Sequence, residues 1–335
     1  MGLLTNRRQD IERAKGLAIL FVVFGHIVAR TDPLRVEWYE PIRRAIYTFH
    51  MPFFLYLSGY VAVLSGALFL PPEKWCDLLA SRTRRLLLPF LVLGLLTVGG
   101  KIVAGVFVFV DNRPASLATG LENLLWHTAD SPALSIWYLF VLFTLSVTAP
   151  MLVWLDRGRL RYFIVSVSLI YLIPLPAFVY LDHIGKYSIF FALGAWAAVM
   201  GARWNDFIDR YWRAFFILLA GALILVAGFG APWPVKLELL LIGIVSMPAL
   251  HGLVRYGRLP FAQMFLWLGR NCFMIYLFNT ICIGLAKGIL LRVTNWDGSH
   301  FLPFAIVLMA AGSLGPILLE KTVFQRVRLI GRQTA

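Results

Sequence analysis

The chain has 335 residues, of which 60% are hydrophobic and 14% are charged, and its formal net charge is +14. Soluble domains average about 45–50% apolar and about 25% charged residues, so this composition excludes an ordinary soluble domain and indicates a helical membrane protein. Basic loops and their contact with anionic lipid account for the positive charge, which therefore does not indicate binding to nucleic acid.

Apolar stretches of about 20 residues, the length needed to cross a bilayer, recur along the whole sequence. The predicted spans are residues 16–30, 46–69, 86–110, 134–155, 162–181, 184–201, 214–231, 235–254, 265–290 and 301–319. We therefore expect an all-α fold, a polytopic transmembrane bundle of about ten helices that forms one domain over residues 1–335. If the N-terminus is cytoplasmic, roughly two thirds of the 31 Lys and Arg residues lie on cytoplasmic loops, which favours both termini inside.

The first apolar stretch, KGLAILFVVFGH, begins with Lys15 and ends with His26. This spacing corresponds to about three helical turns, so both polar groups face one side of a helix and lie roughly 16 Å apart along its axis. Ionisable groups inside a membrane helix are costly and usually mark a functional site. We interpret the pair as the two ends of a catalytic channel. A signal peptide also begins with basic and then apolar residues, but no A-x-A-like cleavage site follows here.

The second informative stretch is TFHMPFFLYLSGY, at the outer end of the second predicted span. It places His50 a few residues inside that span, at a depth similar to that of His26 near the outer leaflet. Two facing imidazoles could share the role of general base toward a hydroxyl group, because their ordinary pKa lies near neutral pH. Alternatively, each could be a buried histidine bonded to a backbone carbonyl. The common depth of the two residues favours a catalytic role.

The stretch SRTRRLLLPF gathers Arg82, Arg84 and Arg85 at the cytoplasmic end of the third predicted span. Guanidinium groups bind phosphates through bidentate hydrogen bonds, so the cluster could hold a phosphorylated molecule. A cluster that only anchors the helix on the cytoplasmic side would look the same. Pro89 is expected to break or kink the helix just inside the membrane.

Six sequence blocks together carry a family resemblance: KGLAILFVVFGH, FHMPFFLYLSGY, SRTRRLLLPF, IWYLFVLF, FFALGAW and LGRNCFMIYLFN. In this order they resemble the integral-membrane acyltransferase 3 family, and within it the exopolysaccharide and fucose O-acetylase-like members. The resemblance implies transfer of an acyl group, usually acetyl, from cytosolic acyl-CoA to a sugar hydroxyl on a lipid-linked or exported glycan. It aligns the family's basic residue and histidine with Lys15 and His26, and its arginine motif with Arg82 and Arg85. The acidic residue common before the first helix matches Glu12.

The sequence and the resemblance lead to one set of expected roles. An extended pantetheine arm is on the order of 15–20 Å long, comparable with the rise from Lys15 to His26. Lys15, Arg82 and Arg85 would hold the acyl-CoA phosphates. His26 and His50 would perform the chemistry, by direct transfer or through an acyl-histidine. Many family members have histidine where this chain has Asn279, an amide that does not titrate and is expected to contact substrate.

Candidate substrate contacts, some of which could also stabilise an oxyanion, are Ser58, Trp137, Tyr138 and Asn279, and Tyr56 is a further possible oxyanion donor. The expected partners are acyl-CoA, a carbohydrate or lipid-linked glycan acceptor and the bilayer of a bacterial inner membrane, with acyl-CoA as a substrate and no permanently bound cofactor. The three cysteines, Cys76, Cys272 and Cys282, form neither a disulfide framework nor a metal motif.

The loop at residues 111–132 is the likeliest extra-membrane site for the acceptor on this interpretation. Its segment LATGLENLLWHT has helix-like apolar spacing and could lie flat on the membrane, with Glu122, Trp126, His127 and Asp130 exposed to sugar. A plain interfacial helix is the alternative. A different class of function is also open: in a proton-coupled secondary transporter of an anionic solute, His26 and His50 would relay protons. A transporter does not account for the six sequence blocks.

Overall fold

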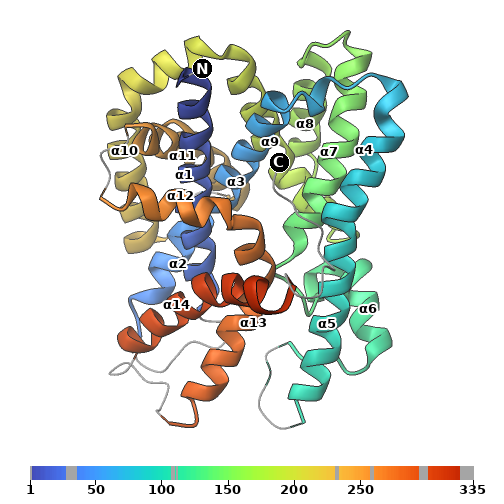
Figure 1. Cartoon of the computed structure of the whole chain (residues 1–335), viewed down its shortest axis with the longest axis vertical. Coiled ribbons are helices and arrows are strands. Elements are labelled where there is room, and N and C mark those ends of the chain that lie inside the picture. The colour runs from blue at the N-terminus through green and yellow to red at the C-terminus, as the bar shows by residue number, and fades with distance from the viewer. Residues whose placement is uncertain are drawn as a thin grey trace. The chain divides into compact units, whose positions relative to one another are not determined.

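The computed structural model describes residues 2–27, 36–106, 110, 112–230, 234–256, 260–293 and 301–324, with side chains from residue 9 to residue 322. Within these ranges every regular element is a helix, as predicted (Figure 1). Seven helical stretches in the described residues are long and apolar enough to cross a membrane: Tyr39–Leu64, Pro72–Ala104, Trp137–Leu155, Ala202–Phe229, Val235–Arg255, Cys272–Leu290 and Phe301–Thr322. The chain is therefore a multi-pass helical membrane protein.

Three of the predicted spans coincide with helices outside this set. α1 (Gly2–Gly25) and α9 (Leu181–Met200) are long enough to cross a bilayer but carry charged residues in their first halves. α8 (Arg161–Leu172) has 12 residues and is too short, since a span needs about 20. It ends because Ile173 adopts an extended conformation before Pro174, as residues preceding proline usually do.

The predicted span at 265–290 is two helices, α12 (Ala262–Arg270) and α13 (Cys272–Leu290), which meet at Asn271. The outer ends of the predicted spans 16–30 and 86–110 include residues outside the described ranges. Residue 1 and residues 325–335 also lie outside the described ranges, and the predicted cytoplasmic position of the termini falls on them.

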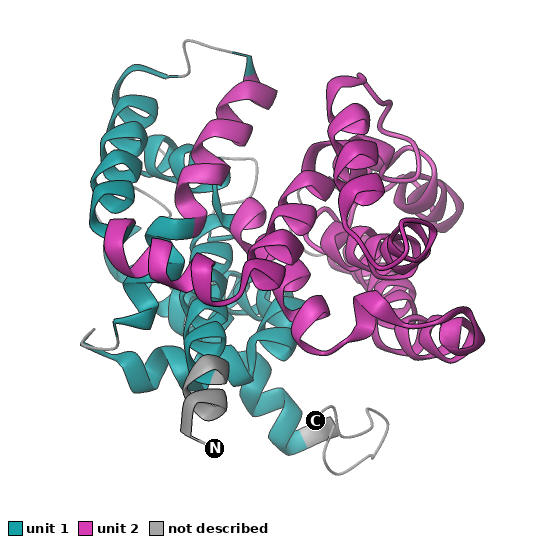
Figure 2. Cartoon of the chain, turned by 90° about the horizontal axis from the view of Figure 1, so that it is seen from above, with its two compact units in different colours: residues 1–50, 212–234, 248–335 teal, residues 51–211, 235–247 magenta. Residues whose placement is uncertain are grey.

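The chain divides into two compact units that interleave along the sequence (Figure 2). Unit 1 comprises residues 1–50, 212–234 and 248–335, and unit 2 comprises residues 51–211 and 235–247. Unit 1 contains α1, α2 (Tyr39–Tyr47), α12, α13 and α14 (Phe301–Leu319), together with the later parts of α10 (Ala202–Phe229) and α11 (Val235–Arg255).

In unit 1, α1 packs closely against α12 because glycines line the contact. A Cβ atom on Gly16 would lie 1.9 Å from the Phe265 carbonyl oxygen, and one on Gly269 would lie 1.8 Å from the Glu12 carbonyl oxygen. No side chain fits at either position, so the two backbones touch only because these residues are glycine. This contact explains the glycine in the LGRN sequence block.

Unit 2 contains α3 (His50–Leu64) beyond its first residue, α4 (Trp75–Arg82), α5 (Leu88–Ala104), α6 (Leu117–Leu125), α7 (Trp137–Leu155), α8 and α9. α3 and α9 meet through the same device. A Cβ on Gly59 would lie 1.9 Å from the Phe191 carbonyl oxygen, and one on Gly194 would lie 1.9 Å from the Tyr56 carbonyl oxygen. The FFALGAW block therefore carries a helix contact.

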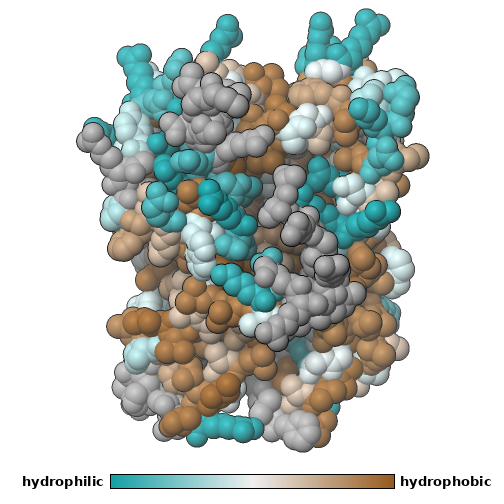
Figure 3. Space-filling view, viewed as in Figure 1, coloured by the Kyte–Doolittle hydropathy of each residue, from teal (hydrophilic) through white to brown (hydrophobic). Residues whose placement is uncertain are grey.

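The surface agrees with a membrane environment. Large apolar side chains such as Leu96, Leu172 and Phe229 are exposed, and apolar residues cover much of the face shown in Figure 3. An exposed apolar surface of this size is unfavourable in water and is expected where a protein faces lipid.

Candidate active site

Of the first two predicted site residues, Lys15 lies on α1 and His26 directly follows it. Lys15 Nζ forms an ion pair with Glu12 Oε1 at 2.8 Å, one turn away, and both side chains are partly buried. The prediction that His26 lies inside a helix spanning 16–30 is corrected, because the helix ends at Gly25 and His26 occupies the turn that follows.

Two tyrosine hydroxyls from α2 satisfy the end of α1. Tyr39 donates a hydrogen bond to the Phe24 carbonyl at 2.6 Å, and Tyr47 donates one to the Gly25 carbonyl at 2.9 Å. The last carbonyls of a helix have no partner within the helix, so these bonds stabilise its end and hold α2 beside the residue that follows. Sequence reasoning missed this role, although two tyrosines frame the segment YEPIRRAIY.

His50 is buried and its ring is oriented by its own chain. Its Nδ1 lies 2.9 Å from the Ile46 carbonyl oxygen, and its ring packs on that of Tyr47 with centroids 4.9 Å apart. Because a carbonyl only accepts hydrogen bonds, Nδ1 carries the proton and the neutral ring keeps a lone pair on Nε2. His50 is linked to the end of α1 through Tyr47, whose hydroxyl bonds the Gly25 carbonyl and whose ring packs on His50. That the two imidazoles face one another stays a prediction.

Arg43 is a further member of this group, and the sequence patterns did not single it out. Its guanidinium lies 2.6 Å from Glu40 and 5.6 Å from the centre of the Tyr47 ring. It is also near enough to His26 to act on it electrostatically. The end of α1 therefore combines two imidazoles, a phenol and a guanidinium.

The arginine motif lies in unit 2, with Arg82 at the end of α4 and Arg85 in the π-helical turn Thr83–Leu87 that follows. The expected break at Pro89 is absent, because the helix continues through it into α5. Pro89 has no N–H to donate, and the Leu88 N–H just before it reaches back five residues. Arg82 is half-buried and its Nε has no hydrogen-bond partner among the described residues, while Arg85 is exposed nearby. Both guanidinium groups have donors available to an anion.

Ser58 and Tyr138 are brought together, with their hydroxyl oxygens 2.6 Å apart. The Ser58 hydroxyl donates to the Phe54 carbonyl at 2.9 Å, so it accepts the hydrogen bond from Tyr138 and has no donor left for an oxyanion. The Tyr56 hydroxyl accepts a hydrogen bond from Trp204 Nε1 at 2.8 Å. This part of unit 2 therefore serves to join helices, and Ser58 is a poor candidate for oxyanion stabilisation.

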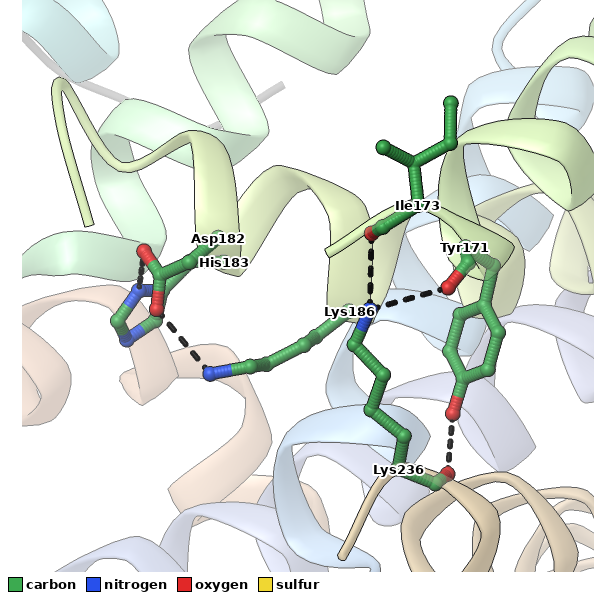
Figure 4. Close-up of polar contacts among 6 residues, drawn as sticks. All are labelled: Tyr171, Ile173, Asp182, His183, Lys186 and Lys236. Atoms are coloured by element: carbon green, nitrogen blue, oxygen red, sulfur yellow. Dashed lines mark hydrogen bonds and ion pairs between the residues drawn. The ribbon is translucent and has the colours of Figure 1, made fainter. Parts of the chain in front are cut away.

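Trp137 lies in an aromatic and charged cluster at the start of α9. Its ring stacks on Tyr187 at 4.8 Å and lies 4.5 Å from the His183 ring. Asp182 accepts a hydrogen bond from His183 Nδ1 at 2.8 Å and pairs with Lys186 at 3.1 Å (Figure 4). The sequence indicated only a short turn at these charged residues, so their grouping around Trp137 is new.

Asn279 is buried on α13 in unit 1. Its Nδ2 donates to the carbonyls of Ile275 at 2.9 Å and Tyr276 at 2.8 Å, whereas its Oδ1 is buried without a hydrogen-bond partner among the described residues. Cys272, seven residues earlier on the same helix face, is near enough to Lys15 to interact with it. Asn279 therefore lies about two helical turns along α13 from Cys272, the residue near Lys15.

The predicted site residues are divided between the two units. Unit 1 holds Lys15, His26, His50 and Asn279. Unit 2 holds Ser58, Arg82, Arg85, Trp137 and Tyr138. Among the described residues, no group of three His, Cys, Asp or Glu side chains could hold a metal ion.

The fold defines a multi-pass helical membrane protein. Its candidate site places His26 after the end of α1 and His50 at the start of α3. The model of the acyltransferase domain family matches residues 8–320, and the chain belongs to this family. Nodulation protein NolL of Mesorhizobium japonicum is 29% identical over 234 residues, which are 67% of this chain and 57% of that protein. Nodulation protein NolL of Sinorhizobium fredii is 35% identical over 88 residues, 26% of this chain and 23% of that protein.

The chain thus covers little more than half the length of the first of these relatives. No solved structure matches the chain.

Proposed function

We propose that the protein is a membrane O-acyltransferase. It moves an acyl group, with acetyl as the expected one, from cytosolic acyl-CoA to a hydroxyl of a cell-surface or exported carbohydrate, and it resides in a bacterial inner membrane. The observation that supports this most strongly is that Tyr47 joins the end of α1, just before His26, to the ring of His50 in a chain of the acyltransferase family.

The group at the end of α1 is suited to acyl transfer. His26 would take the proton of the acceptor hydroxyl as its oxygen attacks the thioester carbonyl. The C–O bond forms, the C–S bond breaks, and the CoA thiolate receives that proton from the imidazolium. His50, with its Nδ1–H on the Ile46 carbonyl, would present Nε2 as a fixed hydrogen-bond acceptor. Arg43 supplies positive charge where the tetrahedral oxyanion develops.

Donor binding is assigned to the cationic residues. Arg82 and Arg85 have unpaired guanidinium donors that match phosphate oxygens, and Lys15 adds a third cation. Lys15 is also paired with Glu12 at 2.8 Å, so it would contact phosphate only as part of that ion pair or after releasing it.

The test is incubation of the purified protein with acyl-labelled acyl-CoA and an exported polysaccharide. We expect release of CoA and a base-labile acyl ester on the polysaccharide, and a higher KM for acyl-CoA in the Arg82→Ala, Arg85→Ala double variant. Lysine at both positions should restore only part of the affinity, because an ammonium group lacks the bidentate fork. CoA-independent counterflow of an anionic solute, with no ester formed, would replace this proposal with transport.

A further inference from the structure

An exposed pair of aromatic rings stands out in unit 2. Trp126 follows α6 and Phe178 lies between α8 and α9, and their ring centroids are 5.7 Å apart with planes only 14° from parallel. Trp126 is 50% exposed and Phe178 is 49% exposed. Aromatic side chains usually stabilise a protein by burying their faces. In this pair each ring covers one face of the other, and about half of each residue stays exposed.

Backbone pairing holds the two rings together. His127 and Phe178 form an isolated antiparallel bridge, and the Thr128 N–H donates to the Ala177 carbonyl at 3.3 Å. The paired segments are some fifty residues apart in sequence, so tertiary structure alone brings Trp126 against Phe178. The surface is therefore preformed.

The residues that follow Phe178 adopt a costly backbone conformation. Val179 and Tyr180 have φ of 47° and 57°, in the left-handed region that a β-branched residue such as valine rarely occupies. Tyr180 is buried and its hydroxyl donates to the Leu124 carbonyl at 3.1 Å, which fixes this corner against α6. Strained backbone of this kind is found mostly where a precise local geometry is used.

Ionisable side chains surround the aromatic pair. His127 Nε2 lies 3.4 Å from Glu122 Oε1, with these side chains 62% and 56% exposed, and Asp130 is exposed nearby in sequence. Exposed charges are costly in hydrocarbon, so this surface belongs to an aqueous or interfacial setting. Flat aromatic faces beside carboxylate and imidazole groups match a sugar ring, whose C–H face stacks on aromatics while its hydroxyls form hydrogen bonds.

The aromatic series continues within unit 2 toward a predicted substrate contact. The Tyr180 ring lies 5.9 Å from His183, and His183 lies 4.5 Å from Trp137. Packed rings thus connect the corner that follows Phe178 with Trp137, with Tyr180 buried between them.

We propose that Trp126 and Phe178 form a subsite that holds one sugar ring of an oligosaccharide acceptor, at a distance from the hydroxyl that receives the acyl group. Glu122 and His127 bind hydroxyls of the same ring. The subsite rests on the proposed function, because it assumes that the acceptor is a glycan, and it makes that acceptor a chain of several sugars.

The test uses the full chain in lipid nanodiscs with oligosaccharides of two to eight residues, cut from the host cell's own exported polysaccharide, and with the constituent monosaccharides. We expect Trp126→Ala and Phe178→Ala each to raise KM for the octasaccharide roughly three- to tenfold, the loss of one stacking contact. The KM values for monosaccharides and acyl-CoA should stay within about twofold of wild type. Trp126→Phe should keep most of the affinity, and it also tests the subsite if the alanine variants fold poorly.

Trp154→Ala is the matched control, because Trp154 is equally exposed but meets Trp75 edge to face, at 5.8 Å and 85°. An octasaccharide KM within about twofold of wild type in the Trp126 and Phe178 variants would overturn the subsite. So would a loss of membrane insertion without a change in length dependence, which would make the pair an interfacial anchor.

Binding of the octasaccharide without acyl-CoA separates the two proposals. Suppose that wild type binds the octasaccharide, Trp126→Ala does not, and wild type transfers no acyl group to it. The subsite then stands and the proposed function fails. If acyl transfer proceeds and neither binding nor KM depends on Trp126 or Phe178, the proposed function stands and the subsite is overturned.

Discussion

The two histidines at the end of α1 differ in how their rings are held. His50 is buried and its Nδ1 donates to a carbonyl one turn earlier, whereas the His26 ring is half-buried and has no hydrogen-bond partner among the described residues. The expected alternative of a buried histidine bonded to a backbone carbonyl is therefore correct for His50, yet it leaves Nε2 available. A ring held this way suits orientation of a proton-transfer partner, and the less constrained ring suits the reacting role.

We expect His26→Ala to lower acyl transfer by at least about 100-fold, the usual contribution of a general base, while the protein remains inserted and folded. The fold should survive because His26 lies in the turn after α1, and the hydroxyls of Tyr39 and Tyr47 already hold the end of that helix. Turnover of labelled acyl-CoA and the melting temperature in detergent are measured together. Near-normal turnover in a well-expressed variant would remove His26 from the mechanism.

Asn279 offers a second test at the level of one side chain. A buried acceptor without a partner costs about 1–3 kcal/mol, so Asn279→Leu should raise the melting temperature. If the amide oxygen contacts substrate, the same variant should raise KM for one substrate several-fold. Thr280→Val, on the neighbouring position of α13, is the control. An unchanged KM would leave Asn279 without a role in binding.

Helix contacts through glycine set the architecture of each unit. Gly16 and Gly269 join α1 to α12, and Gly59 and Gly194 join α3 to α9, with each Cβ position within 2 Å of a backbone oxygen. Backbone atoms cannot move aside as a flexible side chain can. In membrane proteins such small residues let helices approach closely, since lipid provides no hydrophobic drive for helix association.

Gly194→Ala and Gly269→Ala should therefore each abolish folding or lower the melting temperature strongly. Gly284→Ala is the control, because a Cβ at Gly284 meets no atom within 4 Å. Alanine there should be neutral or stabilise α13 by up to about 1 kcal/mol, the difference in helix propensity. Thermal unfolding in detergent gives all three values. A Gly194→Ala variant as stable as wild type would show that α3 and α9 do not touch as described.

The start of α8 depends on a carboxylate just past the end of α7. Asp156 accepts hydrogen bonds from the Arg161 guanidinium at 2.8 Å and from the backbone N–H groups of Arg161 at 2.8 Å and Tyr162 at 3.3 Å. The Arg161 side chain is the main reason why the pKa of the Asp156 carboxyl lies below its ordinary value. The first N–H groups of a helix have no partner within it, so Asp156 acts as their cap.

A lowered pKa in the folded state gives stability that is complete above the unfolded-state pKa, near pH 4, and is lost as the pH falls through the folded-state pKa. The melting temperature of wild type should therefore fall from about pH 4 downward more steeply than that of Asp156→Asn. Glu73→Gln, which removes an exposed carboxylate, should leave the wild-type slope in place. Parallel melting curves for wild type and Asp156→Asn across this range would contradict the assignment.

For the whole molecule, the distribution of basic residues and the exposed apolar surface both concern the membrane. The excess of Lys and Arg on one set of loops favours a cytoplasmic N-terminus, and on that orientation His26 and His50 open outward. Acyl-CoA and its acceptor would then be consumed from opposite faces. Such transfer needs a polar passage, because the bilayer interior accepts polar groups only where protein or water satisfies them.

In sealed vesicles of defined orientation, acyl-CoA on the cytoplasmic face should acylate an impermeant oligosaccharide on the outer face, with no free acyl-CoA crossing. Vesicles without the protein, and vesicles with His26→Ala, are the controls. Acylation only when both substrates share the cytoplasmic side would mean that the passage does not exist and that the depth assigned to the two histidines is wrong.

The sequence by itself determined the class of the protein, because hydropathy and motif spacing are properties of the chain order. It predicted a polytopic helical bundle and the family, and it indicated His26, which follows α1, and His50, which begins α3, as candidate residues of one site. It did not predict the shortened α8, the break at Asn271 or the π-helical turn before Pro89. Those features depend on single prolines and local hydrogen bonds that a hydropathy window averages out.

Tertiary structure alone decided which partners the polar side chains have. Ser58 meets Tyr138, Tyr47 reaches the end of α1, and Trp126 stacks on Phe178, across separations of 80, 22 and some fifty residues. Hydrogen bonds and ring contacts act over a few ångströms, so they form only after helices have packed, and the packing is set by glycine contacts that a linear pattern does not show. For this reason the sequence did not show that the Ser58 hydroxyl is already bonded to Phe54 and Tyr138, and the contacts of Arg43 and Tyr47 were missed.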